Sequence, residues 1–308
     1  MTKIFIDGSS GTTGLKIHKR LEGRKDIDLI ILPDELRKDK TAVKDALNSC
    51  DVAFLCLPDD AAREAAALLD DQGTVIIDTS TAHRTSDDWV YGFSELTGYK
   101  KKIASSKRIA NPGCHASGFI SLISPLVENG IISTDAFLSC YSLTGYSGGG
   151  KKMIAEYESE DRSKLLKGPR IYGLGQMHKH IPEMVKITGM KTAPAFCPVV
   201  CDFYSGMESS ICLQAEQING NIDKIKEVYK DYYRGSRLIR FNDDAAENGF
   251  LSAAAFSGLD SMEISVFGNA ERILLVSRFD NLGKGASGAA IQNMNIVIGA
   301  DETEGLVL

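Results

Sequence analysis

One cysteine in this sequence stands where a thiol could act as a nucleophile. Cys114 follows Asn111-Pro112-Gly113 and precedes a run with the apolar spacing of a helix. A thiol at a helix N-terminus sees the positive end of the helix dipole, which favours the thiolate. The tight turn can also aim backbone N–H groups at a nearby oxygen, as an oxyanion site requires. The alternative is a buried structural cysteine, which is the usual role of this residue.

The other cysteines lack this position between a loop and a helix. Four lie in or beside apolar runs and are expected in the core: Cys50, Cys56, Cys140 and Cys212. Two lie in a strand-like stretch, where they could be half-buried: Cys197 and Cys201. Seven cysteines without CxxC pairs predict reduced thiols in a cytoplasmic protein, and neither a disulfide framework nor a metal site.

A nucleophilic thiol needs a proton carrier, and the stretch GQMHKHIPEM offers candidates. It contains His178 and His180, with Glu183 one helical turn after the second histidine. Pro182 fits the first turn of a helix, from which Glu183 could reach His180 and fix its tautomer. A single histidine more often has no catalytic role. His18, which lies among lysines, is expected to be exposed to solvent. The histidine pair therefore leaves a catalytic and a structural role both open.

The N-terminal stretch DGSSGTTG predicts a phosphate-binding loop. Gly8, Gly11 and Gly14 follow a strand pattern and lead into a helical pattern. Glycines let the backbone approach a pyrophosphate closely, and the helix N-terminus offers N–H groups to the anion. Hydroxyl groups could add further donors: Ser9, Ser10, Thr12 and Thr13. The alternative is a plain glycine turn before a helix.

The charged stretch after the second apolar run bears on the choice of cofactor. Asp34 stands where an acidic residue could hold the ribose of NAD, but Arg37 and Lys38 follow closely. Cations there suit the 2′-phosphate of NADP. The sequence leans to NADP, with a solvated charged loop as the alternative.

These residues need a scaffold, and the first hundred residues alternate apolar runs with helical patterns. The expected strands are 3–8, 28–33, 51–58 and 73–80, and the expected helices are 13–21, 41–49 and 61–71. Continuous apolar runs separated by helices indicate a parallel sheet covered on both faces. The fold class is therefore α/β, with a doubly wound, Rossmann-like sheet.

The alternation of apolar runs and helical patterns ends after about residue 135. We expect a strand that runs into a glycine-rich loop, a strand pair around a Ser-Gly turn, a helix capped by Asn221, a hairpin around Gly268-Asn269 and a helix over 283–299. Hairpins and helices without the earlier alternation predict a second, α+β domain.

Composition excludes several classes of partner. The formal net charge of −6 over 308 residues argues against nucleic acid. No apolar stretch is long enough to span a bilayer, and the N-terminus lacks the layout of a signal peptide.

Four motifs in this order resemble the N-acetyl-γ-glutamyl-phosphate reductases, and most closely their shorter form: GSSGTTG, NPGC, HKHIPE and NLGKGASGAAIQNMN. The chain is more distantly similar to aspartate-semialdehyde dehydrogenase and glyceraldehyde-3-phosphate dehydrogenase. The resemblance implies an NADP-binding domain at 1–113 and 285–308, and a catalytic and oligomerisation domain at 114–284.

The resemblance implies NADPH-dependent reduction of an acyl phosphate to a semialdehyde and phosphate, through a thioester, in arginine biosynthesis. Cys114 takes the place of the family's nucleophile. We assign the acid/base role to His180 and a supporting role to His178. Backbone N–H groups at Cys114, and the side chain of Asn111, are expected to hold the oxyanion.

The resemblance also implies roles for residues elsewhere. Asn281 and Gly283 fall in the family's stretch that returns to the cofactor. Other residues are expected to bind substrate: Asn111, Arg84, Ser147, Lys151 and Glu183. One departure is His83, where we expect an aromatic residue. The family further implies a homo-oligomer, dimeric or tetrameric.

Three other functions compete with this interpretation. Aspartate-semialdehyde dehydrogenase differs only in the acyl group. A cysteine hydrolase leaves the glycine loop unexplained. A non-catalytic NADP-binding regulator leaves Cys114 and the His-x-His stretch without a role.

Overall fold

The computed structural model describes residues 1–33, 35–70 and 73–308. The chain divides into two compact units, residues 1–112 with 286–306 and residues 113–285 with 307–308. Each unit is built on one sheet. No helix in the described residues is long and apolar enough to cross a membrane.

The first unit contains a parallel sheet with the order β2-β1-β3-β4-β6-β5. Its strands are β1 (Thr2–Asp7), β2 (Ile27–Ile30), β3 (Val52–Leu55), β4 (Val75–Asp78), β5 (Val90–Tyr91) and β6 (Arg108–Ala110). The chain passes from β1 to β2 on one side and returns to β3 on the other. Such a reversal of strand order places a ligand site at the carboxyl ends of β1 and β3.

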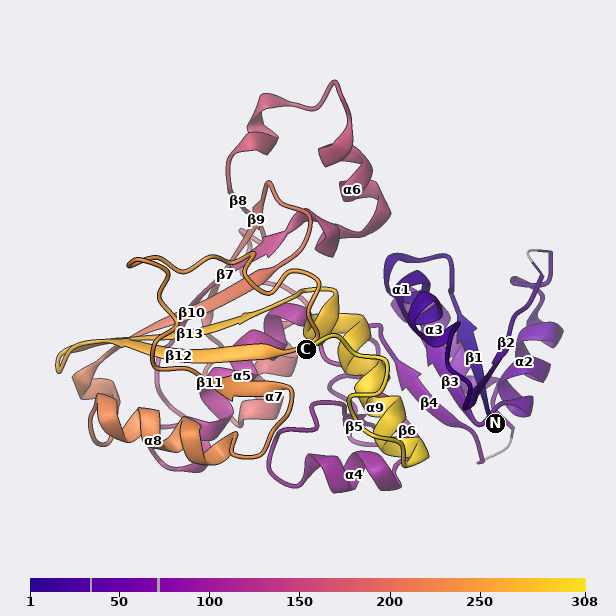
Figure 1. The fold of residues 1–308 in the computed structure, drawn as a ribbon, viewed down its shortest axis with the longest axis horizontal. Helices are drawn as coiled ribbons and strands as arrows, with labels where there is room; N and C mark the ends of the chain where they lie inside the picture. Colours follow the sequence, from indigo (N-terminus) through magenta and orange to yellow (C-terminus); the bar gives the residue numbers. More distant parts are fainter. Residues whose placement is uncertain (34, 71–72) are drawn as a thin grey trace. The chain divides into compact units, whose positions relative to one another are not determined.

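Helices cover both faces of this sheet (Figure 1). They are α1 (Thr12–Leu21), α2 (Lys40–Ser49), α3 (Asp59–Ala67), α4 (Tyr99–Ser105) and α9 (Gly288–Ile298). On β1, Ile4 and Ile6 pack with residues of α1, α4 and α9, while Phe5 packs with α2 and α3. Alternate side chains of one strand thus enter two cores, which explains the continuous apolar runs. The doubly wound α/β prediction is confirmed.

The second unit contains a mixed sheet with the order β11-β12-β13-β10-β7-β9-β8. Its strands are β7 (Ser139–Gly145), β8 (Arg170–Ile171), β9 (Ala195–Cys201), β10 (Met207–Gln214), β11 (Ile239–Phe241), β12 (Met262–Gly268) and β13 (Arg272–Phe279). The hairpin expected around Gly268 is present, since β12 and β13 pair antiparallel up to that residue. The second, α+β domain is confirmed.

The helices of the second unit are α5 (Cys114–Glu128), α6 (Gly150–Glu158), α7 (Ile181–Thr188) and α8 (Ile222–Tyr232). In Figure 1, α5 and α8 lie along one face of the sheet, and the segment with α6 projects away from it. Asn221 caps α8 by accepting the N–H of Lys224 at 2.9 Å, as its sequence predicts. Short helical turns complete the unit: Tyr146–Gly149, Lys164–Lys167, Ala215–Gln217 and the π-turn Gly283–Ser287.

The strand pair expected around the Ser-Gly turn is wrong. β7 lies between β9 and β10, parallel to the first and antiparallel to the second. The turn does not close a hairpin because its backbone pairs with the end of β7: Ser147 N donates to Tyr204 O at 3.0 Å and Gly145 N to Gly206 O at 3.0 Å.

The unit boundaries differ from the expected ranges by a few residues. Gly113 groups with the second unit because it caps α5 and donates its N–H to Glu183. Val307 and Leu308 also belong there, since Val307 N donates to Asp260 Oδ2 at 2.9 Å and Asp260 N to Val307 O at 2.6 Å.

Candidate active site

Cys114 is the first residue of α5, with Gly113 at the N-cap. The Gly113 N–H donates to Glu183 Oε2 at 3.2 Å, and Glu183, on α7, is only 1% exposed. A buried carboxylate on one helix therefore binds the backbone at the start of the other. This contact fixes α7, and the histidines before it, next to the end of α5 that begins with Cys114.

The two histidines of the His-x-His stretch have different environments. His180 is buried at the N-cap of α7, and its backbone N–H donates to His178 Nδ1 at 3.1 Å. Burial lowers the pKa of His178 to about 4, so this ring is neutral near pH 7. His180 Nε2 lies 3.9 Å from Glu183 Oε1, an ion-pair distance beyond hydrogen-bond reach. Pro182 stands in the first turn of α7, as predicted.

The residue after Cys114, His115, belongs to a hydrogen-bond network that the sequence does not reveal. Its ring is buried, with Nδ1 2.7 Å from Ser142 Oγ and Nε2 2.6 Å from the Tyr172 hydroxyl. The ring centroids of His178 and His180 lie 5.5 and 5.7 Å away. The signal that could have found it is its place beside Cys114, but its partners come from distant parts of the chain.

A glycine packs directly against Cys114. A Cβ built on Gly285 would lie 2.9 Å from Cys114 Cβ, closer than real Cβ atoms approach one another. Only a residue without a side chain can bring this π-turn so close to the head of α5. Gly285 thus explains part of the glycine-rich sequence after β13.

The glycine loop between β1 and α1 has the geometry of an anion cradle. Gly8 has φ +80°, and a Cβ on it would overlap the carbonyl oxygen of Cys56 at the end of β3. A Cβ on Gly14 would overlap the carbonyl oxygen of Gly8. No described side chain caps α1, whose N-cap is Gly11, so its first N–H groups point to the loop. These features fit the pyrophosphate of a dinucleotide.

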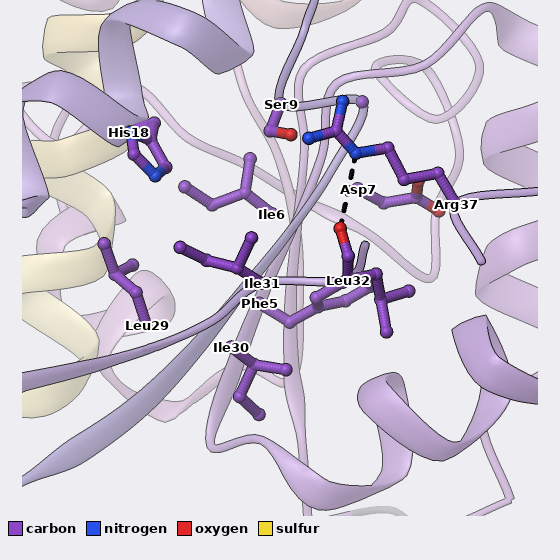
Figure 2. Close-up of a pocket in the computed structure, with 11 residues that line it drawn as sticks. Phe5, Ile6, Asp7, Ser9, His18, Leu29, Ile30, Ile31, Leu32 and Arg37 are labelled. Carbon is purple, nitrogen blue, oxygen red and sulfur yellow. Dashed lines mark hydrogen bonds between the residues drawn. The ribbon is translucent and has the colours of Figure 1, made fainter. Parts of the chain in front are cut away.

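A pocket in the first unit extends from this loop along β1 and β2 (Figure 2). Ser9 and Arg37 lie at one end of it, and His18 and Leu29 at the other. The Arg37 Nε donates to Leu32 O at 3.4 Å. A cation beside the glycine loop suits the 2′-phosphate of NADP. Lys38 is exposed and is not among the described residues that line the pocket.

His18 was expected to be solvated, but it is half-buried and lines the pocket because its helix begins at the glycine loop. Asp34, the candidate partner of a ribose, lies outside the described residues. Ser10 is exposed in the loop, and Thr12 and Thr13 head α1.

Arg84 and Asn111, expected to bind substrate, make contacts within the first unit. Arg84 Nε donates to Asn111 O at 2.8 Å. Asn111 Nδ2 donates to Ala286 O at 3.0 Å, and its Oδ1 accepts from Asn293 Nδ2 at 3.2 Å. His83, in place of the expected aromatic residue, stacks on Trp89 with ring centroids 3.9 Å apart. The substrate role of Arg84 and Asn111 stays a prediction.

The remaining predicted residues lie in the second unit. Asn281 Nδ2 donates to Ser147 Oγ at 3.0 Å, and its Oδ1 accepts from Gly206 N at 3.0 Å. Gly283 leaves no room for a Cβ, which would overlap the carbonyl oxygen of Leu259. Lys151 is exposed on α6. The cofactor and phosphate roles of these residues also stay predictions.

The other thiols contrast with Cys114. Burial raises the pKa of Cys50 to about 12 and also raises that of Cys140, which keeps both thiols protonated and inert. Cys212, expected in the core, is exposed, because it lies on the outward side of β10. No group of His, Cys, Asp or Glu side chains in the described part of the chain could hold a metal ion.

The fold and the position of the thiol define the semialdehyde-dehydrogenase class. A family described as semialdehyde dehydrogenase, NAD binding domain, matches residues 33–105, and one described as semialdehyde dehydrogenase, dimerisation domain, matches residues 114–281. Aspartate semialdehyde dehydrogenase II of Vibrio cholerae, in a solved complex, has a TM-score of 0.74 at 17% identity and covers 97% of this chain and 98% of its own. The enzyme of Francisella tularensis gives 0.72 at 16%, with coverage of 97% and 100%. These structures establish the fold.

Closer relatives establish the family. N-acetyl-gamma-glutamyl-phosphate reductase 2 of Nostoc sp. is 42% identical, over 99% of both chains. The protein of that name in Pseudomonas putida is 40% identical, over 98% of both chains. The chain belongs to the N-acetyl-γ-glutamyl-phosphate reductase family.

Proposed function

We propose that this chain reduces N-acetyl-γ-glutamyl phosphate to N-acetylglutamate semialdehyde and phosphate with NADPH, a step of arginine biosynthesis. The observation that carries the proposal is the junction of α5 and α7. There the buried Glu183 binds the backbone before Cys114 and holds His180 in the same unit.

Cys114 acts as the nucleophile. Its thiolate attacks the acyl carbon, the carbon–oxygen bond to phosphate breaks, and a thioester forms on Sγ. NADPH supplies the hydride when it is bound. After reduction of the thioester carbonyl, the carbon–sulfur bond breaks and the thiolate is released with the semialdehyde. The backbone N–H groups at the head of α5 stabilise the oxyanion.

His180 is the acid and base of this scheme. The supporting observations are its burial, its place at the N-cap of α7 and its distance to Glu183. His178 supports it through the hydrogen bond from the His180 backbone, and burial keeps the His178 ring neutral.

The cofactor is NADP. The glycine loop holds the pyrophosphate at the N-terminus of α1, and Arg37 binds the 2′-phosphate at the end of the neighbouring pocket. Asn281 and Gly283 keep the cofactor role that the family resemblance implies. Substrate binding falls to Asn111, Arg84, Ser147 and Lys151.

The alternative substrate, β-aspartyl phosphate, has only the fold in its favour. The aspartate semialdehyde dehydrogenases share 17% or less of their residues with this chain among the structures compared. The non-catalytic regulator finds no support in a chain that keeps a thiol at a helix N-terminus beside two histidines.

The reverse reaction tests the proposal. N-acetylglutamate semialdehyde, phosphate and NADP should give NADPH, with a lower rate for NAD and none for aspartate semialdehyde. Cys114→Ser should abolish turnover and keep NADPH binding. Preferential turnover of aspartate semialdehyde, or wild-type turnover by Cys114→Ser, would contradict it.

We further propose that the chain works in the cytoplasm as a homo-oligomer, dimeric or tetrameric. All seven cysteines are thiols, as a reducing compartment requires. The match of residues 114–281 to a dimerisation domain supports self-association. Sedimentation equilibrium tests the oligomeric state, and a monomer at assay concentrations would contradict this part.

A further inference from the structure

Asn111, to which the proposed function gives a part in substrate binding, has its side-chain amide held by two partners. Its Nδ2 donates to Ala286 O at 3.0 Å, and its Oδ1 accepts from Asn293 Nδ2 at 3.2 Å. All three residues belong to the first unit. Asn111 directly follows β6, at the carboxyl edge of the parallel sheet, where ligands bind in folds of this kind. The orientation of the amide therefore decides what a ligand meets there.

The backbone of Asn111 is fixed by the strands beside it. Its N–H donates to Asp78 O at 2.7 Å, and its carbonyl oxygen accepts from Arg84 Nε at 2.8 Å. Asp78 ends β4, which pairs with β6. Packing alone does not decide which end of the side-chain amide faces which partner, because its oxygen and nitrogen have nearly the same size. Hydrogen bonds must decide it.

Two backbone carbonyls fix the orientation of both amides. Asn293 Nδ2 donates to Gly92 O at 2.9 Å, and a carbonyl can only accept, so the end of Asn293 that faces Gly92 is the nitrogen. The same nitrogen faces Asn111, which must then present its oxygen. The Asn111 nitrogen is left for Ala286 O, another acceptor. A reversed Asn111 would set oxygen against oxygen at one end and nitrogen against nitrogen at the other.

This arrangement leaves Asn111 with one N–H for a ligand. Its Nδ2 carries two N–H groups, of which one binds Ala286 O. The other has no partner within residues 1–33, 35–70 and 73–308. A donor suits an oxygen that can accept, and an acyl phosphate carries two kinds, the acyl oxygen and the phosphate oxygens. A bond to a charged oxygen is the stronger kind.

Gly92 makes the room that Asn293 occupies. A Cβ built on Gly92 would overlap Asn293 Nδ2 and lie 3.1 Å from Asn293 Cγ. The Gly92 N–H donates to Ala110 O at 2.8 Å, which holds its backbone against the end of β6. A side chain at this position would therefore push the Asn293 nitrogen away from the two oxygens that accept from it.

We propose that Asn293 is a positioning residue for the substrate, whose amide fixes Asn111 with one N–H free to donate to an oxygen of the acyl phosphate. Gly92 in turn sets the place of Asn293. The inference rests on the substrate role of Asn111 in the proposed function. It gives α9 a part in the reaction beyond packing on the sheet.

Steady-state kinetics of Asn293→Ala in the reverse direction test this. The substrates are N-acetylglutamate semialdehyde, phosphate and NADP. Without the Asn293 N–H, the oxygen of Asn111 loses the donor that holds it, and the amide can turn away from the substrate. The ratio kcat/KM should fall at least about tenfold, the effect of weakening one hydrogen bond to a charged group.

The separate kinetic constants show which oxygen Asn111 binds. For a phosphate oxygen, KM for phosphate should rise while kcat is kept. For the acyl oxygen, which gains negative charge only in the transition state, kcat should fall while KM for phosphate is kept. Either pattern supports the positioning role.

Gly92→Ala disturbs the same contact without removing a polar group. Its Cβ displaces Asn293 Nδ2, so the kinetic loss should match that of Asn293→Ala, and the double variant should lose no more than either. The double variant also lacks the overlapping amide. In urea denaturation followed by the fluorescence of Trp89, which lies in the first unit, it should be more stable than the sum of the single effects.

Asn295→Ala is the matched control on the same helix. The amide of Asn295 is also buried, accepts from Arg24 Nη1 at 2.6 Å, and donates to Glu304 O at 2.9 Å and Glu302 O at 3.3 Å. Both of its ends have partners, whereas Asn293 Oδ1 has none among the described residues. Asn295→Ala should therefore lower stability at least as much as Asn293→Ala and leave kcat/KM unchanged.

The outcomes separate the two proposals. A wild-type kcat/KM in Asn293→Ala overturns the inference, and so does an equal loss in Asn295→Ala, which a purely structural role predicts. A loss in Asn293→Ala without one in Gly92→Ala overturns the place given to Gly92. The expected losses, measured with aspartate semialdehyde in an enzyme that does not turn over the N-acetyl compound, contradict the proposed function alone.

Discussion

Replacing Gly118 with alanine should destabilise the second unit, although alanine is the better helix former. Gly118 lies inside α5, where alanine is favoured by roughly 0.5–1 kcal/mol. A Cβ at this position would overlap Ser209 Oγ and lie 2.8 Å from Ser209 Cβ and 3.2 Å from a ring carbon of Phe279. The helix and the sheet would have to move apart, or Ser209 would have to give up its hydrogen bond to Ser142.

The sign of the effect follows from these two contributions. Overpacking a close-packed core costs about 1–3 kcal/mol. Subtracting the gain in helix propensity leaves a loss of up to about 2.5 kcal/mol in the free energy of unfolding, and the contact with Ser209 Cβ, under 3.0 Å, favours the upper part of this range. A change of the Ser209 rotamer would move its Oγ but not its Cβ, which would still lie 2.8 Å from the added Cβ, so a rotamer change alone does not relieve the clash.

Urea denaturation followed by far-UV circular dichroism measures this loss. The single tryptophan, Trp89, reports on the first unit and is unsuitable for α5. The matched control adds Ser209→Gly, which removes the clashing atoms, so the double variant should be more stable than the sum of the single effects. A Gly118→Ala protein as stable as the wild type, or strictly additive effects, would refute the reasoning.

Three further predictions concern the cofactor loop, its pocket and acid. Gly8→Ala forces a side chain into φ +80° against the carbonyl oxygen of Cys56, so NADPH affinity should fall at least about tenfold in a fluorescence titration; unchanged affinity would exclude a cradle there. Arg37→Gln should weaken NADPH by about 10–100-fold and leave NADH unchanged, with Lys38→Gln as the control; equal losses for both cofactors would contradict the 2′-phosphate site. Burial lowers the pKa of His115 to about 3 and that of His178 to about 4, below about 6.5 in the unfolded chain. As the pH falls from 6.5 toward 4, the unfolded state binds these protons first, so the free energy of unfolding declines by up to about 1.4 kcal/mol per pH unit for each ring. His115→Phe should reduce that slope in urea titrations, and an unaltered slope would be inconsistent with a neutral buried ring.

The sequence predicts the first unit well because its signals are local. Each strand of β1 to β4 is a short apolar run, and both faces of the sheet are buried, so the runs stand out. The glycine loop and the caps of α7 and α8 are likewise set by adjacent residues. Cys114 at the head of α5 belongs to this group, since a turn followed by a helix can be recognised from a dozen residues.

The pairing of distant strands could not be predicted in this way. Residues 195–214 contain two good strands and a turn, but whether the strands pair depends on β7, which lies far earlier in the chain. The same holds for the partners of His115: Ser142 lies on β7, where it also meets Ser209 of the neighbouring β10, and Tyr172 follows β8, which pairs with β9. Alternation along a strand gives the buried face and not the partner across it.

Helix α5 shows why the residues of this site are hard to recognise as a pattern. Nearly every residue from His115 to Leu126 is buried, so apolar side chains would pack at any of these positions. Polar groups there carry a desolvation cost unless they are paired. His115 and Ser121 have hydrogen-bond partners, whereas the hydroxyl oxygens of Ser117 and Ser124 have none among the described residues. These polar positions therefore cannot be recognised from the periodicity of the helix, and the room that Gly118 leaves for Ser209 depends on a strand that is distant in the sequence.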